Sequence, residues 1–427
     1  MKIIGQSDFD AAGFRDRPLW TGRQFRRAER IVQDVRTAGL AGLLEWSRRL
    51  DGAAPEKLVL KTRDLERLSD GADKAGCKAV DRAAASIARF ARAQKKSLSE
   101  VKLSPAPGVT TEARIEALDS AGGYVPGGRY PLISTALMNL IPAREAGVGR
   151  IAAATPPNEK GRLSGIMAYA LLKAGAAEVL LAGGAQAVAA MAFGVKGFGA
   201  VDKIVGPGNV YVTAAKYIVS SHVGVDMLAG PSEICIVADS AAEAELIAWD
   251  LLAQAEHDVL ATPLLFTSSR RLAARVNAEI ESNLRDLRTA DVARQSLKRG
   301  AIVVFRSLEA ALSAADRLAP EHLELHVSAA ATRARDQRHF GSLFAGGAAA
   351  EVLGDYSAGI NHTLPTQGAA RYRGGLSVLD FLKVQTVLTA KPGPGSDRLA
   401  GLAAQLAELE GLPAHATAAR KRIRGKR

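Results

Sequence analysis

The chain has 427 residues, which corresponds to about two to four domains of ordinary size. Hydrophobic residues make up 48% and charged residues 23%, a balance that excludes a globally disordered chain. No apolar run reaches the ~18 residues of a membrane span, and no apolar core of a signal peptide is visible at the N-terminus. Two cysteines, Cys77 and Cys235, are too few for a disulfide framework or a cysteine-based zinc site. We therefore expect a cytoplasmic protein.

The formal net charge of +12 raises the question of nucleic-acid binding. Apart from the tail ARKRIRGKR at 419–427, however, the basic residues are scattered along the chain. Aromatic residues amount to only 5%, too few for a clear set of base-stacking platforms. We therefore expect no nucleic-acid partner. Nucleic-acid binding remains a remote alternative, whose signature would be strongly salt-dependent affinity.

The first third of the chain is predicted to be mainly helical. Apolar residues recur at helical spacing over 31–44, and an alanine-rich run with charges on one side covers 73–96. The period changes in TEARIEALD, residues 111–119, where polar and apolar side chains alternate. That alternation predicts a strand with one solvated face.

Short apolar runs then alternate with helix-length segments. Strands that end in Gly or Pro are predicted in 150–157, 178–184 and 202–208. Helices are predicted between them, over 134–146, 161–174, 185–193 and 209–220. Such alternation predicts parallel βαβ units, which bind ligands beyond the carboxyl ends of their strands.

The same rhythm resumes after residue 232, with strands predicted in 233–239, 263–268, 301–307, 322–327 and 342–347. The fold class is therefore α/β, with two Rossmann-like parallel-sheet domains and small helical extensions at both ends. The N-terminal helices need a sheet to cover, and we assign them to the later one. The predicted division is an N-terminal extension (1–22), a discontinuous first domain (23–123 with 234–373), a second domain (124–233) that would carry NAD, and a C-terminal helical arm (374–427).

Three glycine-rich turns fall in the predicted second domain. No full GxGxxG fingerprint is present, because GPGNVY has Tyr211 where the third glycine would stand. The turns YVPGG, GGAQA and GPGN are nevertheless placed to present backbone N–H groups to an anion at helix starts. A glycine at one such turn is more often structural, but three turns in succession favour a nucleotide site.

Two motifs pair a histidine with an oxygen-bearing side chain. In QAEHD, Gln254 and His257 are three residues apart on a predicted helix and share a face, which suits zinc. In APEHLEL, Glu321 and His322 are adjacent at the start of a predicted strand and offer two proton-transfer groups. Taken alone, each motif is more often a pair of ordinary, hydrogen-bonded polar residues than a functional site.

Two further segments contain histidines. GDYSAGINHTLPT places Asp355 and His362 in a glycine-punctuated loop, and LEGLPAH places Glu410 and His415 near the C-terminus. A histidine near a chain end is ordinarily a surface residue. The chain has only seven histidines, however, and four of them lie in these four motifs.

Together these segments resemble the histidinol dehydrogenase family, zinc- and NAD-dependent enzymes of the last step of histidine biosynthesis. The resemblance covers about residues 25–420 and is carried, in order, by YVPGGRYP, GGAQAVAAMAFG, VDKIVGPGN, DMLAGPSE, LLAQAEHD, APEHLEL, GDYSAGINHTLPT, GLSVLDF and LEGLPAH. It implies oxidation of L-histidinol through L-histidinaldehyde to L-histidine, with reduction of two NAD and one Zn²⁺ per subunit.

Carried over position by position, the resemblance assigns roles to twelve residues. The zinc ligands would be Gln254, His257, Asp355 and His415. The catalytic pair would be Glu321 and His322, and the NAD contacts would be Tyr124, Gln186 and Asn209. The substrate contacts would be Ser232, Gln254, His257, His322, Asp355, His362, Glu410 and His415. In the family the last two come from the partner subunit, so the resemblance also implies a homodimer with an exchanged C-terminal arm.

None of these positions is substituted in this chain. The family also contains relatives that oxidise other small alcohols, notably dihydroxypropanesulfonate. GPSE at 230–233 is typical of the histidinol enzymes, whereas Arg371 and Arg373 in ARYRGGLSV resemble the sulfonate relatives. Histidinol is therefore the expected substrate, and a sulfonated diol is the alternative.

Overall fold

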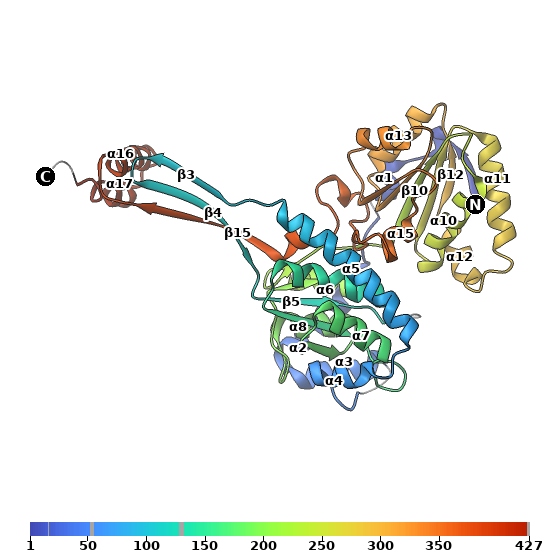
Figure 1. Ribbon diagram of the computed structural model, residues 1–427, viewed down its shortest axis with the longest axis horizontal. Coiled ribbons are helices and arrows are strands. Elements are labelled where there is room, and N and C mark those ends of the chain that lie inside the picture. The colour runs from blue at the N-terminus through green and yellow to red at the C-terminus, as the bar shows by residue number, and fades with distance from the viewer. Residues whose placement is uncertain (16, 52–54, 128–131, 425–427) are drawn as a thin grey trace.

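The computed structural model describes residues 1–15, 17–51, 55–127 and 132–424. Two α/β units lie side by side, and a long arm with a pair of helices at its tip extends away from both (Figure 1). The end of the motif YVPGGRYP and the last three residues of the basic tail lie outside the described residues.

The first sheet has six strands that all pair in parallel, in the order β1-β12-β11-β10-β13-β14. Its strands are β1 (Lys2–Gly5), β10 (Glu233–Ala238), β11 (Thr262–Thr267), β12 (Ala301–Val304), β13 (His322–His326) and β14 (Ser342–Ala345). The five strands predicted after residue 232 are thus confirmed. The first residues do not form a separate extension, because β1 pairs with β12 as an edge strand.

Helices cover both faces of the first sheet. One face carries α10 (Ala244–His257), α11 (Arg270–Asn283) and α12 (Ala290–Leu297), and the other carries α1 (Ala11–Arg15) and α13 (Leu308–Leu318). The short elements are η1 (Gln6–Asp8), α14 (Ala330–Arg333), η2 (Ala334–Asp336), α15 (Glu351–Tyr356), η3 (Ala369–Arg371) and η4 (Val378–Phe381). The buried strands are rich in Val, Ile and Leu because a parallel sheet has no solvated face.

The second sheet has the order β2-β7-β6-β5-β8-β9, and only its edge strand β2 pairs in the antiparallel direction. Its strands are β2 (Val59–Lys61), β5 (Ser120–Tyr124), β6 (Arg150–Thr155), β7 (Glu178–Leu181), β8 (Lys203–Val205) and β9 (Gly224–Val225). The predicted helices of this region are confirmed as α6 (Ile133–Ala146), α7 (Gly165–Ala174), α8 (Gly184–Phe193) and α9 (Val210–Val219).

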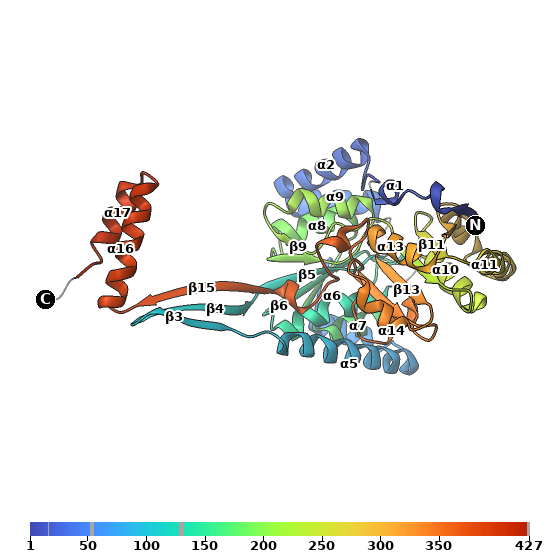
Figure 2. The ribbon, with the colours of Figure 1, turned by 90° about the horizontal axis from the view of Figure 1, so that it is seen from above.

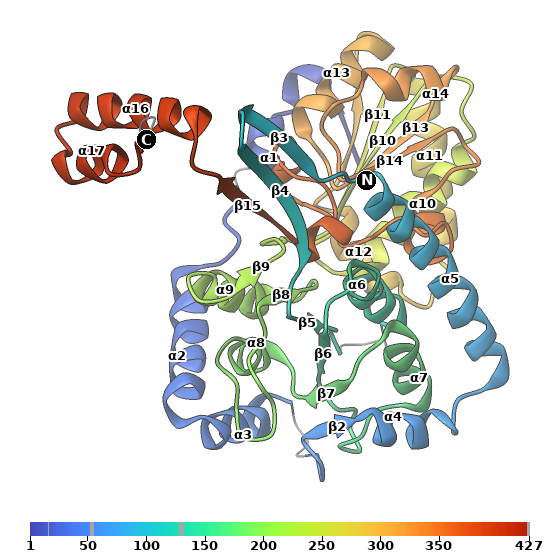
Figure 3. The ribbon, with the colours of Figure 1, turned by 60° about the vertical axis from the view of Figure 1, so that its left-hand side comes forward.

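The N-terminal helices pack on this second sheet, and the predicted assignment of 23–123 to the other domain is wrong. They are α2 (Gly22–Ala38), α3 (Leu40–Leu50), α4 (Thr62–Ser69) and α5 (Lys74–Lys96). Ile31 and Val35 of α2 share a core with Val188 of α8, whereas Ile87 of α5 shares one with Leu140 of α6. Figure 3 shows α2, α8 and α9 on one side of the strands and α5, α6 and α7 on the other.

The arm is a three-stranded antiparallel sheet in the order β15-β4-β3, with α16 (Pro394–Leu409) and α17 (Pro413–Arg420) at its tip (Figure 2). Its strands are β3 (Val101–Ala106), β4 (Val109–Ala117) and β15 (Leu382–Ala390). The strand predicted in 111–119 is confirmed within β4. The arm is not wholly helical as predicted, because the alternating sequence LKVQTVLTA pairs with β4 along its whole length.

A buried ion pair supports the turn that follows β8. Lys216 of α9 pairs with Asp226, and both side chains are almost fully buried. The Lys216 ammonium also donates to the Gly206 carbonyl at 2.9 Å, and the Gly206 N–H donates to Asp226 at 2.7 Å. The ion pair therefore holds the peptide groups on both sides of Gly206.

Removing one partner would leave the other charge buried and unpaired. We expect Lys216→Met to lower the free energy of unfolding by about 3–5 kcal/mol, measured by urea denaturation. The control is Glu45→Gln, which breaks the exposed Glu45–Arg49 pair and should cost less than ~1 kcal/mol. Equal, small losses in both variants would contradict a supporting role for the buried pair.

Candidate functional site

The predicted site residues of the two units lie at opposite edges of their sheets. Ser232 and Glu321 directly precede β10 and β13, so they lie at the amino edge of the first sheet. Tyr124 ends β5 and Asn209 follows β8, so they lie at the carboxyl edge of the second. The rule that ligands bind beyond the carboxyl ends of parallel strands therefore describes the second sheet, while the first contributes its opposite edge.

His322 is the first residue of β13 and is buried. Its Nδ1 lies 3.2 Å from the Glu233 carbonyl oxygen, which assigns the proton to Nδ1 and leaves Nε2 as an acceptor. Nε2 is buried and has no hydrogen-bond partner among the described residues. Burial lowers the pKa of His322 to about 3, so the imidazole is neutral at physiological pH and able to accept a proton.

Glu321 lies beside His322 and is also buried. Its Oε2 accepts a hydrogen bond of 2.9 Å from the Glu233 N–H and is 3.8 Å from His322 Nδ1. Burial raises the pKa of Glu321 well above its usual range, and the neighbouring Glu233 and Asp355 carboxyls add to that rise. A hydrogen bond from the Ser232 hydroxyl opposes it. The two residues predicted as the catalytic pair are thus both buried and lie side by side.

A candidate metal cluster lies next to this pair. The ligand atoms of His257, at the end of α10, and of Glu351 and Asp355, on α15, all lie within 4.8 Å of one another. Burial raises the pKa of Asp355 to about 7. Glu351, whose carboxylate is also 3.6 Å from His322 Nδ1, is absent from the predicted ligands. Its place four residues before Asp355, on the same face of a helix, was the available signal.

Gln254 supplies a test of whether the cluster fits a metal ion. It lies one turn before His257 on α10 and is fully buried. Neither its amide oxygen nor its amide nitrogen has a hydrogen-bond partner among the described residues. An unsatisfied buried amide costs about 1–3 kcal/mol, so a side chain in this state is expected to bind something. The donor set of a histidine, a carboxylate and an amide oxygen fits Zn²⁺.

His362 belongs to a segment that ties the two units together. Its Nδ1 is 4.0 Å from Asp355, and its buried Nε2 has no hydrogen-bond partner in the described part of the chain. Burial lowers the pKa of His362 to about 4. On either side, Asn361 donates to the Met138 carbonyl at 2.7 Å and Thr363 donates to Asn139 at 3.2 Å.

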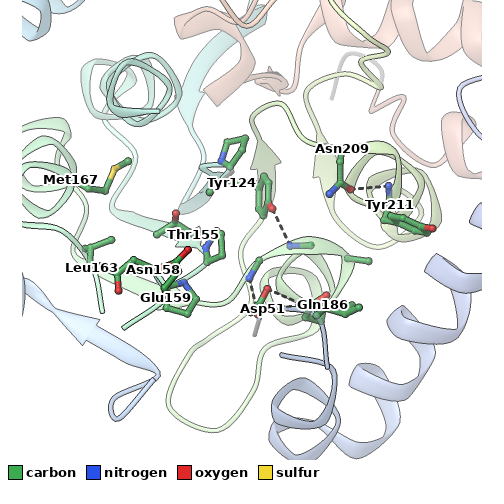
Figure 4. Close-up of a pocket in the computed structure, with 18 of the residues that line it drawn as sticks. Asp51, Tyr124, Thr155, Asn158, Glu159, Leu163, Met167, Gln186, Asn209 and Tyr211 are labelled. Atoms are coloured by element: carbon green, nitrogen blue, oxygen red, sulfur yellow. Dashed lines mark hydrogen bonds between the residues drawn. The ribbon is translucent and has the colours of Figure 1, made fainter. Parts of the chain in front are cut away.

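The three predicted cofactor contacts line one cavity of about 650 Å³ in the second unit (Figure 4). The Tyr124 hydroxyl accepts a 2.9 Å hydrogen bond from the Gly184 N–H. Asn209 caps α9 by accepting from the Tyr211 and Val212 N–H groups.

The cavity also contains Asp51, which the sequence analysis missed. Its carboxylate accepts from the Gly183 N–H and from the Gln186 amide. The N–H groups of Gly183 and Gly184 therefore already have partners within the chain. The prediction that GGAQA and GPGN present free N–H groups to an anion is wrong for Gly183, Gly184 and Gly206, because side chains of the protein accept from these three N–H groups.

Glu410 and His415 lie far from the other site residues of the same chain. Glu410 follows α16 and His415 lies on α17, and both are exposed at the tip of the arm (Figures 1 and 2). Within the candidate metal cluster, His257 is the exposed member, whereas Glu351 and Asp355 are buried. One chain alone thus brings together ten of the twelve predicted site residues in the two units.

Comparison with known proteins identifies the family of the chain. The family model described as histidinol dehydrogenase matches residues 21–423. The histidinol dehydrogenase of Geobacillus kaustophilus is 41% identical over 408 residues, covering 94% of this chain and 95% of that protein. The one from Methanothermobacter thermautotrophicus is 41% identical over 397 residues, covering 92% of each. The solved histidinol dehydrogenase of Elizabethkingia anophelis has a TM-score of 0.92 at 31% identity, covering 99% of this chain and 98% of that one.

Replacing Gln254 by leucine separates metal binding from folding. The amide makes no hydrogen bond within the described chain, so an apolar side chain of similar size should leave the metal-free protein as stable or more stable by about 1 kcal/mol. Zinc content after dialysis, measured by elemental mass spectrometry, should fall at least about tenfold. Gln295→Leu, on the exposed face of α12, is the control and should keep its zinc. Unchanged zinc in Gln254→Leu would remove this residue from the ligands.

Proposed function

The chain belongs to the histidinol dehydrogenase family, and on that premise we propose that it oxidises L-histidinol through L-histidinaldehyde to L-histidine. Two NAD are reduced, and each subunit uses one Zn²⁺. The observation that carries this proposal is the neutral, buried His322, whose Nε2 has no hydrogen-bond partner among the described residues and which lies beside Glu321. Next to this pair lies the cluster of His257 with Asp355, and the buried amide of Gln254 there also lacks a partner among the described residues.

Gln254, His257 and Asp355 would hold the zinc, with His415 of the partner subunit as the fourth ligand. When bound, the zinc would hold the imidazole and the amine of histidinol and so fix the carbinol carbon against the nicotinamide. Two observations support this assignment. The buried amide of Gln254 has no hydrogen-bond partner among the described residues, and His257 and Asp355 lie together in one cluster.

His322 acts as the base in the first oxidation. Its Nε2 would take the proton of the alcohol, and NAD, when bound, would supply the acceptor for the hydride of the carbinol carbon, so that the alcohol becomes the aldehyde. The hydrogen bond from Nδ1 to the Glu233 carbonyl stabilises the imidazolium that forms. The protein's part in this step is to hold that imidazole in one tautomer and orientation.

Glu321 acts in the second oxidation. It takes a proton from a water molecule as the water oxygen adds to the aldehyde carbon, which gives the hydrate after protonation of the carbonyl oxygen. Burial raises the pKa of this carboxyl, and hydrogen bonds from the Glu233 N–H and the Ser232 hydroxyl, which favour the ionised form, oppose that rise. His322, having released its first proton to solvent, deprotonates the hydrate as the second hydride leaves to NAD, and the carboxylic acid results.

We further propose a cytoplasmic homodimer in which the arms are exchanged. The arm carries Glu410 and His415 away from its own site, and α16 exposes Leu402, Leu406 and Leu409. A second copy of the chain would cover these side chains and supply both site residues. Separately, no helix in the described ranges is long and apolar enough to cross a membrane.

The contacts of Arg373 argue against a sulfonated diol as the substrate. This guanidinium donates to the Asp226 carbonyl and lies 3.6 Å from the Asp380 carboxylate. It is therefore engaged in holding the chain after β9 and is a poor candidate for binding a substrate sulfonate. The nucleic-acid alternative gains no feature from the fold beyond the net charge.

A single assay tests the proposal. With zinc and excess NAD, purified protein should form two NADH for each L-histidinol consumed, followed by absorbance. Dihydroxypropanesulfonate is the comparison substrate. Turnover of the sulfonated diol without turnover of histidinol would replace the proposed substrate, and no NADH with either would reject the proposed reaction.

Arm exchange is tested by mixing two inactive variants, His257→Ala and His415→Asn. If His415 acts across the dimer, each hybrid contains one site with both histidines intact, and random exchange should restore about a quarter of wild-type activity. If His415 acts within its own chain, every site keeps one defect and the mixture stays inactive. Wild-type protein passed through the same exchange procedure is the control for losses during handling.

A further inference from the structure

The cavity of the second unit is lined by charges of both signs. Arg27 and Arg162 reach it from exposed positions, and neither has an ion-pair partner among the described residues. Glu159 is an exposed acid on its rim. Asp51 differs from these three because it is half-buried and bonded into the wall, so its place is fixed by the fold (Figure 4).

Asp51 sits where a phosphate sits in many nucleotide sites. It follows α3, and its Oδ2 accepts from the Gly183 N–H at 3.3 Å, directly before α8. The N-terminus of a helix favours an anion, and here the chain supplies that anion itself. A Cβ atom on Gly183 would lie 2.9 Å from Asp51 Oδ1, so the close approach of the carboxylate needs a glycine at this position.

Asp51 has no ion-pair partner among the described residues, and acceptor atoms lie around it. The carboxylate accepts from Gly183 and Gln186 and keeps lone pairs free for further donors. The Gln186 amide oxygen is buried and has no partner in the described part of the chain. Hydroxyl groups would satisfy both acceptors, whereas a phosphate would bring a second negative charge against Asp51.

Asp51 lies in the part of the cavity formed by the turn that follows β7. The segment that carries His362 is anchored on α6, and Arg373 and Asp380 contact the chain after β9 and Lys203 of β8. Asp51 instead contacts Gly183 beyond β7, which is separated from β5 by β6 in the sheet. With the nicotinamide near His322, the adenosine ribose is the part of the dinucleotide expected beside Asp51.

We propose, building on the proposed NAD-dependent function, that Asp51 selects the unphosphorylated dinucleotide. Its carboxylate accepts hydrogen bonds from the hydroxyls of the adenosine ribose and repels a 2′-phosphate at the same place. Arg27 and Arg162 are then the cations left for the diphosphate. Asp51 is thus a specificity-determining residue and takes no part in proton or hydride transfer.

Calorimetric titration of the full chain with NAD and with NADP tests this proposal. Wild-type protein should prefer NAD by at least about tenfold, and Asp51→Asn should lower that preference about tenfold by weakening NAD and strengthening NADP. The matched control is Glu45→Gln, which makes the same charge change on α3 but away from the cavity, and should keep the preference within about twofold. A merely structural role would weaken both dinucleotides alike.

An unchanged preference in folded Asp51→Asn would overturn the role of Asp51 and leave the proposed function standing. Failure of wild-type protein to bind either dinucleotide would overturn the proposed function itself. If Asp51→Asn does not fold, NAD that lacks the 2′-hydroxyl of the adenosine ribose tests the same contact in wild-type protein. It should bind at least about tenfold more weakly than NAD, and equal binding would reject the proposal.

Discussion

The backbone of Glu233 organises the proposed reacting end of the molecule. Its N–H donates to Glu321 and its carbonyl oxygen accepts from His322, so the backbone of one residue orients both members of the proposed catalytic pair. The parallel pairing of β10 with β13 places Ile234 opposite His322 and thereby sets this alignment. If side chains oriented the pair, they would lose rotamer freedom in doing so. The backbone of a strand in the middle of a sheet is already held in place by the neighbouring strands.

Internal carboxylates recur at the turns where a nucleotide-binding fold ordinarily leaves N–H groups open. Asp51 takes the Gly183 N–H, and Asp226 takes the Gly206 N–H. Asn209 does the same at the start of α9 with a neutral side chain. The second unit therefore keeps the layout of a dinucleotide-binding sheet while using its glycine turns mainly for close packing of the chain on itself.

The hydrophobic pattern determined the strands and helices well, because a buried parallel strand has to be apolar on both faces. It could not decide which sheet the N-terminal helices cover, since both sheets lack a solvated face and Ile31 fits against either. The alternation in LKVQTVLTA was a strand signal, and it was outweighed by the helical segment that follows it. Within the site, Glu351 was detectable by its spacing from Asp355, but Asp51 and Glu233 were not, because their roles depend on residues more than eighty positions away.

The segment around His362 has a consequence for the fate of the intermediate. It is pinned to α6 through Asn361 and Thr363, and Thr366 accepts a further hydrogen bond from Gly230 at 2.7 Å. These hydrogen bonds would break together if the two units moved apart. Separating the units between turnovers therefore costs free energy. For the proposed reaction, a connection of this kind favours a second oxidation of the aldehyde over its release to bulk solvent. Retention of the intermediate would then follow from the anchoring of the short segment around His362 on α6.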